Sequence, residues 1–407
     1  MLKIGRIPKK LQKFFKPLRG KFYDEAWAHF WALTMALTVC HRVSINGLSQ
    51  LLRGSTHRTN HGEFLWRSHW EYSPVMQQIA WDMLLSLYRK GDSNLFFIID
   101  DTQTIKRSKK MEGVGKFFHH ATKRYVQGHT ILKVCLYYGG VTIPWASLLY
   151  VKKNHAADLE IPFKKLTELA AEAIDAAAFP ACFKVYVLFD AFYLCSKVVV
   201  ACKRRDWRFI SVGAPNRCFW KGSVKYKLGK YGRNVLKREG KAYSIQGLRK
   251  CRTYRLAERI GRMNGLGEVK IVFSRRKGES HHVALVTDDL HASRKKILSR
   301  YLKRWSIEML IKDEKQCLGL GDYHVRRYQA IVRHLCLVDV AYACLTHLGI
   351  NTQSAQGQKN TKNALRLAPI SKLKEQMRHI VWRDQVQDVI KHTHDKAVIR
   401  RLEKLVA

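Results

Sequence analysis

The chain has 407 residues, of which 46% are apolar, and its 74 basic and 32 acidic side chains give a formal net charge of +42. This length and apolar content exclude a disordered polymer and predict a globular protein of two or three domains. A charge excess of this size repels itself in a compact fold, so we expect a polyanionic partner, with nucleic acid ahead of a membrane surface.

None of the ten cysteines belongs to a CxxC pair, and most lie within apolar runs. This pattern is typical of buried thiols in a reducing compartment and argues against a zinc site. The N-terminus has no signal-peptide-like run, and we find no apolar run as long as a membrane span. We therefore expect a cytoplasmic, nucleoid-associated protein.

Residues 1–94 have the apolar spacing of several short helices. Basic residues surround a polar turn at residues 53–56. This arrangement fits a helix-turn-helix-like DNA reader, although helical pairs are also common in ordinary all-helical domains. We expect a helical DNA-binding domain here.

From residue 95 the pattern changes to fully apolar and alternating runs, which predict strands separated by two helices. The expected strands are 95–99, 129–138, 142–150, 183–189 and 207–212, with helices at 161–178 and 193–204. Three meander strands followed by helix, strand, helix and strand are the element order of a ribonuclease-H-like (retroviral-integrase-like) α/β fold.

The chain from residue 95 onward divides by composition into four parts. We predict a first part of the catalytic core at 95–215, a β-rich insertion at 216–282, a second part of the core at 283–349, and a basic helical region at 350–407.

The segment from residue 301 to 315 has two opposed polar stripes when placed on a helix at about 100° per residue. One stripe, roughly 80° wide, contains Tyr301, Arg304, Glu308, Lys312 and Lys315. The opposite stripe contains Lys303, Ser306, Asp313 and Glu314. The pattern favours a helix wedged into the core, with one polar face toward solvent and the other toward a metal ion beside a phosphate backbone. The alternative is a solvated helix with i,i+4 salt bridges such as Glu308 to Lys312.

Two further acidic positions end predicted strands. Asp100 or Asp101 follows the first strand, and Asp190 follows the fourth. Adjacent strand ends place side chains in one crevice, where three carboxylates would repel each other unless divalent cations joined them. Taken singly, Asp190 could instead be a helix cap or a turn former.

With these residues in view, the chain resembles the DDE transposases of bacterial insertion sequences, in the group with a Tyr-x2-Arg-x3-Glu-x6-Lys (YREK) signature. The signature is complete here as Tyr301, Arg304, Glu308 and Lys315. The first acid of that group is typically an Asp followed by Thr, which selects Asp101. The group also has a β-rich insertion before its Glu helix.

The resemblance implies that Asp101, Asp190 and Glu308 are catalytic and hold two Mg²⁺ ions, for which Mn²⁺ can substitute. Tyr301, Arg304 and Lys315 would hold DNA phosphates, and we add Lys312 from the same stripe. The implied partners are double-stranded DNA, as terminal inverted repeats and target, and a second copy in a homodimer. Two alternatives are a ribonuclease-H-like nuclease without strand transfer and an inactive DNA-binding remnant.

Overall fold

The computed structural model describes residues 3–393, 399 and 402, apart from 42, 55–56, 90, 109, 120–121, 249 and 356–364. Much of the predicted C-terminal region at 350–407 therefore lies outside the described residues.

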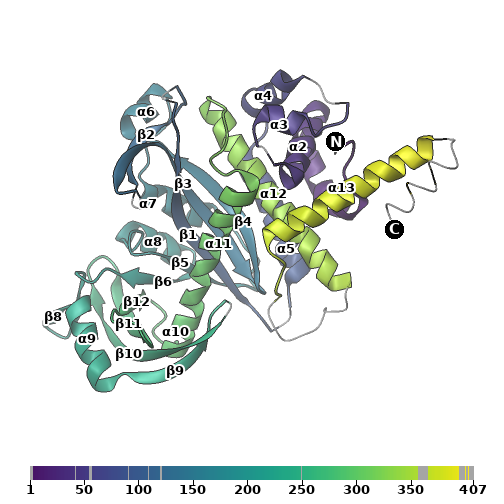
Figure 1. The fold of residues 1–407 in the computed structure, drawn as a ribbon. Coiled ribbons are helices and arrows are strands. Elements are labelled where there is room, and N and C mark those ends of the chain that lie inside the picture. Colours follow the sequence, from purple (N-terminus) through teal and green to yellow (C-terminus); the bar gives the residue numbers. More distant parts are fainter. Residues whose placement is uncertain are drawn as a thin grey trace.

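A sheet of twelve strands forms the centre of the mixed α/β fold (Figure 1). The strands are β1 (Asn94–Ile105), β2 (Gly115–His119), β3 (Arg124–Tyr138), β4 (Val141–Tyr150), β5 (Lys184–Phe189), β6 (Arg208–Gly213), β7 (Cys218–Lys221), β8 (Val224–Lys227), β9 (Lys241–Gln246), β10 (Cys251–Met263), β11 (Gly267–Arg276) and β12 (Val283–Thr287). Their order is β2-β3-β1-β5-β6-β12-β11-β10-β7-β8, with β4 paired to β3 and β9 paired to β10. Only the β1–β5 and β5–β6 pairs are parallel among the strands described, so the sheet is mostly antiparallel.

The five strands β4-β3-β1-β5-β6 match the predicted order of meander, helix, strand, helix and strand. The intervening helices are α7 (Leu166–Ala176) and α8 (Ser196–Arg204), and a short α6 (Lys153–Asp158) follows β4. Apolar runs such as Phe97–Ile99 are fully buried, because a parallel strand in the middle of a sheet is covered by helices on both faces. Burying each of these side chains stabilises the fold by about 1.5–3 kcal/mol.

The region predicted as a β-rich insertion continues the same sheet. Its strand β11 pairs with β12, and β12 pairs with β6 of the core. The predicted strands do not include β2, β7, β8 or β10, and the helix α9 (Leu228–Glu239) was also missed. Gly232 explains why α9 is hard to predict: a Cβ there would lie 2.3 Å from the Phe273 ring, so packing requires a residue that disfavours helices.

The helices before β1 pack around one long helix, α12 (Tyr328–Ala355). They are α1 (Gln12–Phe15), α2 (Asp24–Val39), α3 (Ile45–Ser49), α4 (Arg58–Trp66) and α5 (Tyr72–Leu87), of which α2, α4 and α5 contact α12. The C-terminal helix α13 (Ile370–His392) lies against α2 and α12 (Figure 1). The N-terminal helices are thus built into the core of the molecule.

Helix α12 is long and apolar enough to cross a membrane, contrary to the expectation that no segment reaches that length. However, 89% of its most apolar window is buried inside the protein. It is therefore the central helix of the helical half of the fold.

Candidate active site

Asp100 and Asp101 lie inside β1, which continues to Ile105 rather than ending at Ile99 as predicted. The strand continues because its antiparallel ladder with β3 extends to Ile105, whereas the parallel pairing with β5 stops at Ile98. The two acids thus lie just beyond the part of β1 that faces β5. As neighbours on a strand, they point to opposite faces of the sheet.

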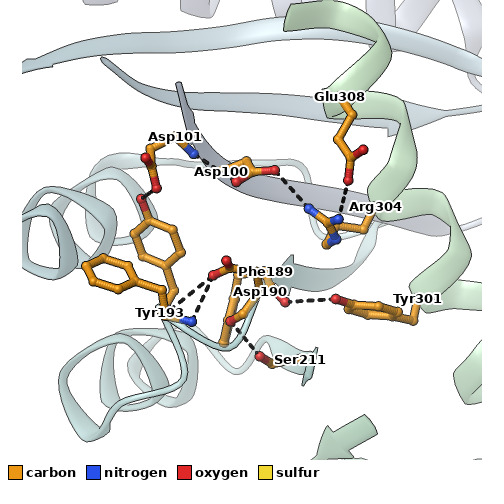
Figure 2. A network of polar contacts seen from close by, with 10 residues as sticks. Asp100, Asp101, Phe189, Asp190, Tyr193, Ser211, Tyr301, Arg304 and Glu308 are labelled. Atoms are coloured by element: carbon orange, nitrogen blue, oxygen red, sulfur yellow. Dashed lines mark hydrogen bonds and ion pairs between the residues drawn. The ribbon is translucent and has the colours of Figure 1, made fainter. Parts of the chain in front are cut away.

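Asp190 follows directly after β5, as predicted. Its carboxylate accepts hydrogen bonds from the backbone N–H groups of Phe192 at 2.9 Å and Tyr193 at 3.4 Å. Its backbone carbonyl accepts one from the Ser211 hydroxyl at 2.9 Å. Asp190 therefore also forms the local turn, which places its carboxylate between the elements that carry the other acids (Figure 2).

Arg304 connects the first strand to the helix that carries Glu308. Its guanidinium donates to Asp100 Oδ2 at 2.8 Å and to Glu308 Oε1 (Figure 2). All three side chains are less than one-third exposed. Glu308 thus pairs with Arg304 rather than with Lys312, the partner considered in the solvated-helix alternative.

Asp101 belongs to a different contact chain. Its Oδ1 accepts a hydrogen bond of 2.8 Å from the hydroxyl of Tyr193. Tyr193 in turn donates its backbone N–H to Asp190. The structure therefore joins Asp100 to Glu308 through Arg304, and Asp101 to Asp190 through Tyr193.

Tyr301 anchors the helical segment to the end of β5, because its hydroxyl donates to the Phe189 carbonyl at 3.4 Å. The segment is not the single regular helix that was predicted. It comprises α10 (Arg294–Tyr301), a 3-10 turn at Leu302–Arg304, α11 (Trp305–Asp313) and a π-helical turn at Glu314–Leu318. Regular spacing at about 100° per residue therefore applies only within α11.

Burial and the neighbouring negative charges raise the pKa of both acids of β1. Burial raises the pKa of Asp100 to about 6; Arg304 opposes this shift, whereas Asp190 and Asp101 add to it. Burial likewise raises the pKa of Asp101, with Tyr193 opposing and Asp190 adding to the shift. The negative charges at the ends of β1 and β5 therefore interact, and a bound cation would relieve their repulsion.

Lys312 and Lys315 are exposed on the same segment. The ammonium of Lys315 donates to the Gln103 carbonyl of β1 at 2.9 Å, and desolvation lowers its pKa. Lys315 thus lies beside the strand that carries the acids, with a backbone partner already in place.

The second polar stripe faces a partly open cleft rather than a free surface. Lys303, Ser306 and Asp313 line this cleft of about 900 Å³ together with the β3–β4 turn, α12 and the segment before α13. The fourth member, Glu314, is completely buried. The helix is wedged into the core, but its second face meets other parts of the protein.

Among the described residues, no three acidic, histidine or cysteine side chains are arranged as a ready metal site. The sequence could not choose between Asp100 and Asp101 from the residues alone, and it did not identify Tyr193 as a partner of the acids. The two adjacent Asp residues were the only sign in the sequence that a choice had to be made. Nothing in the spacing of Tyr193 marks it as a partner of the acids.

Acidic side chains at the carboxyl ends of adjacent parallel strands, facing a helix with a third acid, define a candidate site for chemistry on phosphodiesters. The sequence matches the profile of the DDE superfamily endonuclease family over residues 25–257, more than half of the chain. The protein therefore belongs to the DDE superfamily endonucleases, and this membership indicates a nuclease that acts on DNA.

The matched region begins in α2 and includes Asp100, Asp101 and Asp190, but ends before Glu308. Helices α2 to α5 thus lie within the region that the family profile matches. A search of curated proteins found no match to the chain.

Proposed function

We propose that the protein is a transposase that moves an insertion sequence by cut-and-paste transposition, with a ribonuclease-H-like catalytic core. One observation carries the proposal: acids from β1, from the end of β5 and from α11 converge through Arg304 and Tyr193 in a DDE endonuclease. The strand order β4-β3-β1-β5-β6 and the net charge of +42 support the core assignment and the DNA partner.

Two residues compete for the role of first catalytic acid. The resemblance to the transposases selects Asp101, whereas the contact with Glu308 through Arg304 favours Asp100. With Asp190 and Glu308, either one would supply the carboxylate oxygens that Mg²⁺ or Mn²⁺ prefers. These donors fit divalent cations, because the charges of Asp190 and of both β1 acids already repel. When bound, two such ions would activate the attacking oxygen and stabilise the leaving oxygen of a phosphodiester.

The residues of the chain itself would hold and orient the DNA. The guanidinium of Arg304 bridges Asp100 and Glu308 in the structure, so it would have to turn to a phosphate when cations arrive. Tyr301, Lys312 and Lys315 lie on the same segment and would extend this phosphate contact. We further propose that two copies of the protein form a homodimer that holds both DNA ends of the insertion sequence together. We expect this complex to work in the nucleoid.

A cleavage and joining assay tests the proposal. The purified protein is incubated with Mg²⁺ and a supercoiled plasmid that carries the DNA flanking its gene on both sides. A transposase excises the segment between the ends and joins its 3′ ends to a target, whereas Asp190→Asn does neither.

The same assay separates the alternatives. Cutting without joined products would indicate a nuclease without strand transfer. Binding without cutting would indicate an inactive remnant and would overturn the proposed activity.

A further inference from the structure

Five polar side chains from five different elements meet in the core beside the acids. They are Tyr72 of α5, Lys133 of β3, Ser147 of β4, Glu314 of the π-helical turn and Asp339 of α12. Lys133, Glu314 and Asp339 are 0% exposed. Fully buried charged residues are rare and need partners, so this cluster requires an explanation.

The ammonium of Lys133 is at the centre of the cluster. It lies 2.7 Å from Glu314 Oε2, 2.5 Å from Asp339 Oδ1 and 2.6 Å from the Ser147 hydroxyl. Ser147 donates to Asp339 at 2.7 Å, and the Tyr72 hydroxyl donates to the same carboxylate. Lys133 and Asp339 therefore have their polar atoms satisfied by neighbours from several elements.

Burial and mutual contacts shift the pKa of both Lys133 and Glu314. Desolvation would lower the pKa of Lys133, but Asp339 and Glu314 outweigh it and raise the pKa, so the lysine is charged. Burial raises the pKa of Glu314 well above its ordinary value; Lys133 opposes this shift and Asp339 adds to it. Two acidic side chains thus share the single ammonium of Lys133.

The position of the cluster links two of the candidate catalytic elements. Lys133 is paired with Asp100 in the β1–β3 ladder, so both side chains lie on the same face of the sheet. Glu314 begins the π-helical turn that directly follows α11, the helix of Glu308. The contact between Lys133 and Glu314 therefore ties the strand next to Asp100 to the end of the Glu308 helix.

Stability alone does not account for such a cluster. Desolvating two charges costs several kcal/mol, and apolar residues of similar size often replace a buried ion pair without loss of stability. A π-helical turn is also uncommon and is frequent at functional sites. A role in holding elements in register explains both features.

We propose that Glu314, held by its contact with Lys133, is a positioning residue that fixes the Glu308 helix over the acids of β1 and β5. The inference rests on the proposed metal-dependent cleavage of DNA, because it assigns the cluster to the geometry of that site.

The decisive variant is Glu314→Leu, with Glu314→Gln as its conservative partner. Leu removes the contact with Lys133 and leaves the Lys133–Asp339 ion pair in place, while Gln keeps a hydrogen-bonding group of the same size. Lys270→Met is the matched control, since Lys270 is a buried lysine of β11, a strand separated from β1 by β5, β6 and β12.

Three measurements are made on each variant: melting temperature, Mn²⁺ affinity by calorimetry, and hydrogen exchange of the α11 amides without metal. Glu314→Leu should melt close to the wild type, exchange its α11 amides faster, bind Mn²⁺ about tenfold more weakly and cleave DNA more slowly. Glu314→Gln and Lys270→Met should retain wild-type exchange and Mn²⁺ affinity.

Unchanged exchange and Mn²⁺ affinity in a folded Glu314→Leu protein would overturn the proposal. If Leu prevents folding, Glu314→Met takes its place, since its flexible side chain fills a similar volume. Failure of both apolar variants to fold, with a wild-type Glu314→Gln, would show that the cluster serves folding alone and would also overturn the proposal. A wild type that binds no Mn²⁺ and cuts no DNA would refute the proposed function, whereas the exchange data still decide whether Glu314 fixes α11.

Discussion

The guanidinium of Arg304 already supplies a positive charge between Asp100 and Glu308. In the absence of cations, this contact offsets part of the repulsion among the acids. The same group is suited to bidentate contacts with phosphate. Arg304 is therefore the residue whose partners are expected to change most when metal and DNA bind.

Replacing the acids by amides should separate catalysis from binding. We expect Asp190→Asn and Glu308→Gln each to abolish cleavage and to leave DNA affinity largely intact, because neutral amides are poor ligands for Mg²⁺. Asp101→Asn and Asp100→Asn decide which acid of the pair is catalytic. Normal cutting by Asp101→Asn together with an inactive Asp100→Asn would show that the resemblance selected the wrong residue.

The stability of the metal-free protein should depend on pH through Asp100. Its pKa of about 6 in the fold exceeds the ordinary value of about 4. Between these two pH values the folded protein keeps the proton of Asp100, whereas the unfolded chain has lost it. The contribution of this group to the free energy of unfolding therefore falls as pH rises from about 4 to about 6. Asp100→Asn should therefore stabilise the protein at neutral pH, by up to about 3 kcal/mol, and have little effect below about pH 4.

Thermal melts of Asp100→Asn and of the wild type in a chelating buffer, at neutral pH and below about pH 4, measure this change in stability. Asp158→Asn, at an exposed position of α6, controls for the loss of one negative charge. A gain for Asp100→Asn that is equal at both pH values would contradict the expected titration.

The segment that carries Glu308 combines three kinds of helix, α, 3-10 and π, in four consecutive elements. The α-helix α11 ends at Asp313, so Lys315 reaches β1 from a π-helical turn. The contact with Gln103 gives Lys315 a structural partner beside its predicted DNA contact.

Lys315→Ala should weaken binding to element-end DNA and reduce the slope of log K against log salt by about one. The fold should lose no more than about 1 kcal/mol, because the Lys315 side chain is exposed and makes a single hydrogen bond. Salt-titrated anisotropy and melting curves measure the two effects, with exposed Lys372 of α13 as the control for removing one charge. A large drop in melting temperature with unchanged DNA affinity would make Lys315 a fold-stabilising residue only.

The close approach of α9 to the sheet gives a prediction about stability. Gly232→Ala should destabilise the protein by about 1–3 kcal/mol, since the new Cβ would lie 2.3 Å from Phe273 and overpacking exceeds the gain in helix propensity. Gly62→Ala in α4 is the matched control: nothing lies within 4 Å of its Cβ, so the change should stabilise by up to about 1 kcal/mol. Urea unfolding measures both, and equal effects would contradict the packing argument.

These elements show how far the sequence leads. The apolar runs before Asp100 and Asp190 predict the buried part of β1 and the whole of β5, because burial on both faces leaves a clear pattern; the extension of β1 to Ile105 depends on its pairing with β3. Helix α9 was missed because Gly232 serves tertiary packing at the expense of local propensity. The burial of Glu314 leaves no signal in the sequence, since its partner Lys133 is far away in sequence and only the fold brings them together.

The net charge of +42 is spread over the whole molecule rather than confined to one tail. Without DNA this charge repels itself, so moderate salt should raise the melting temperature of the free protein. The same salt should weaken DNA binding, because phosphate contacts release counterions. Melting curves and binding isotherms over one salt series test both the expected rise in melting temperature and the expected fall in DNA affinity. A melting temperature that falls with salt would show that attractive ion pairs dominate instead.

The ladders of β11 with β12 and of β12 with β6 join the insertion and the catalytic core in one continuous sheet. A force that DNA exerts on the strands of the insertion is thus transmitted to the strands of the acids through backbone hydrogen bonds. The insertion strand β11 also covers the edge of β12, which would otherwise present unpaired backbone groups for aggregation. Removing the insertion would therefore leave an unpaired strand edge in the middle of the sheet.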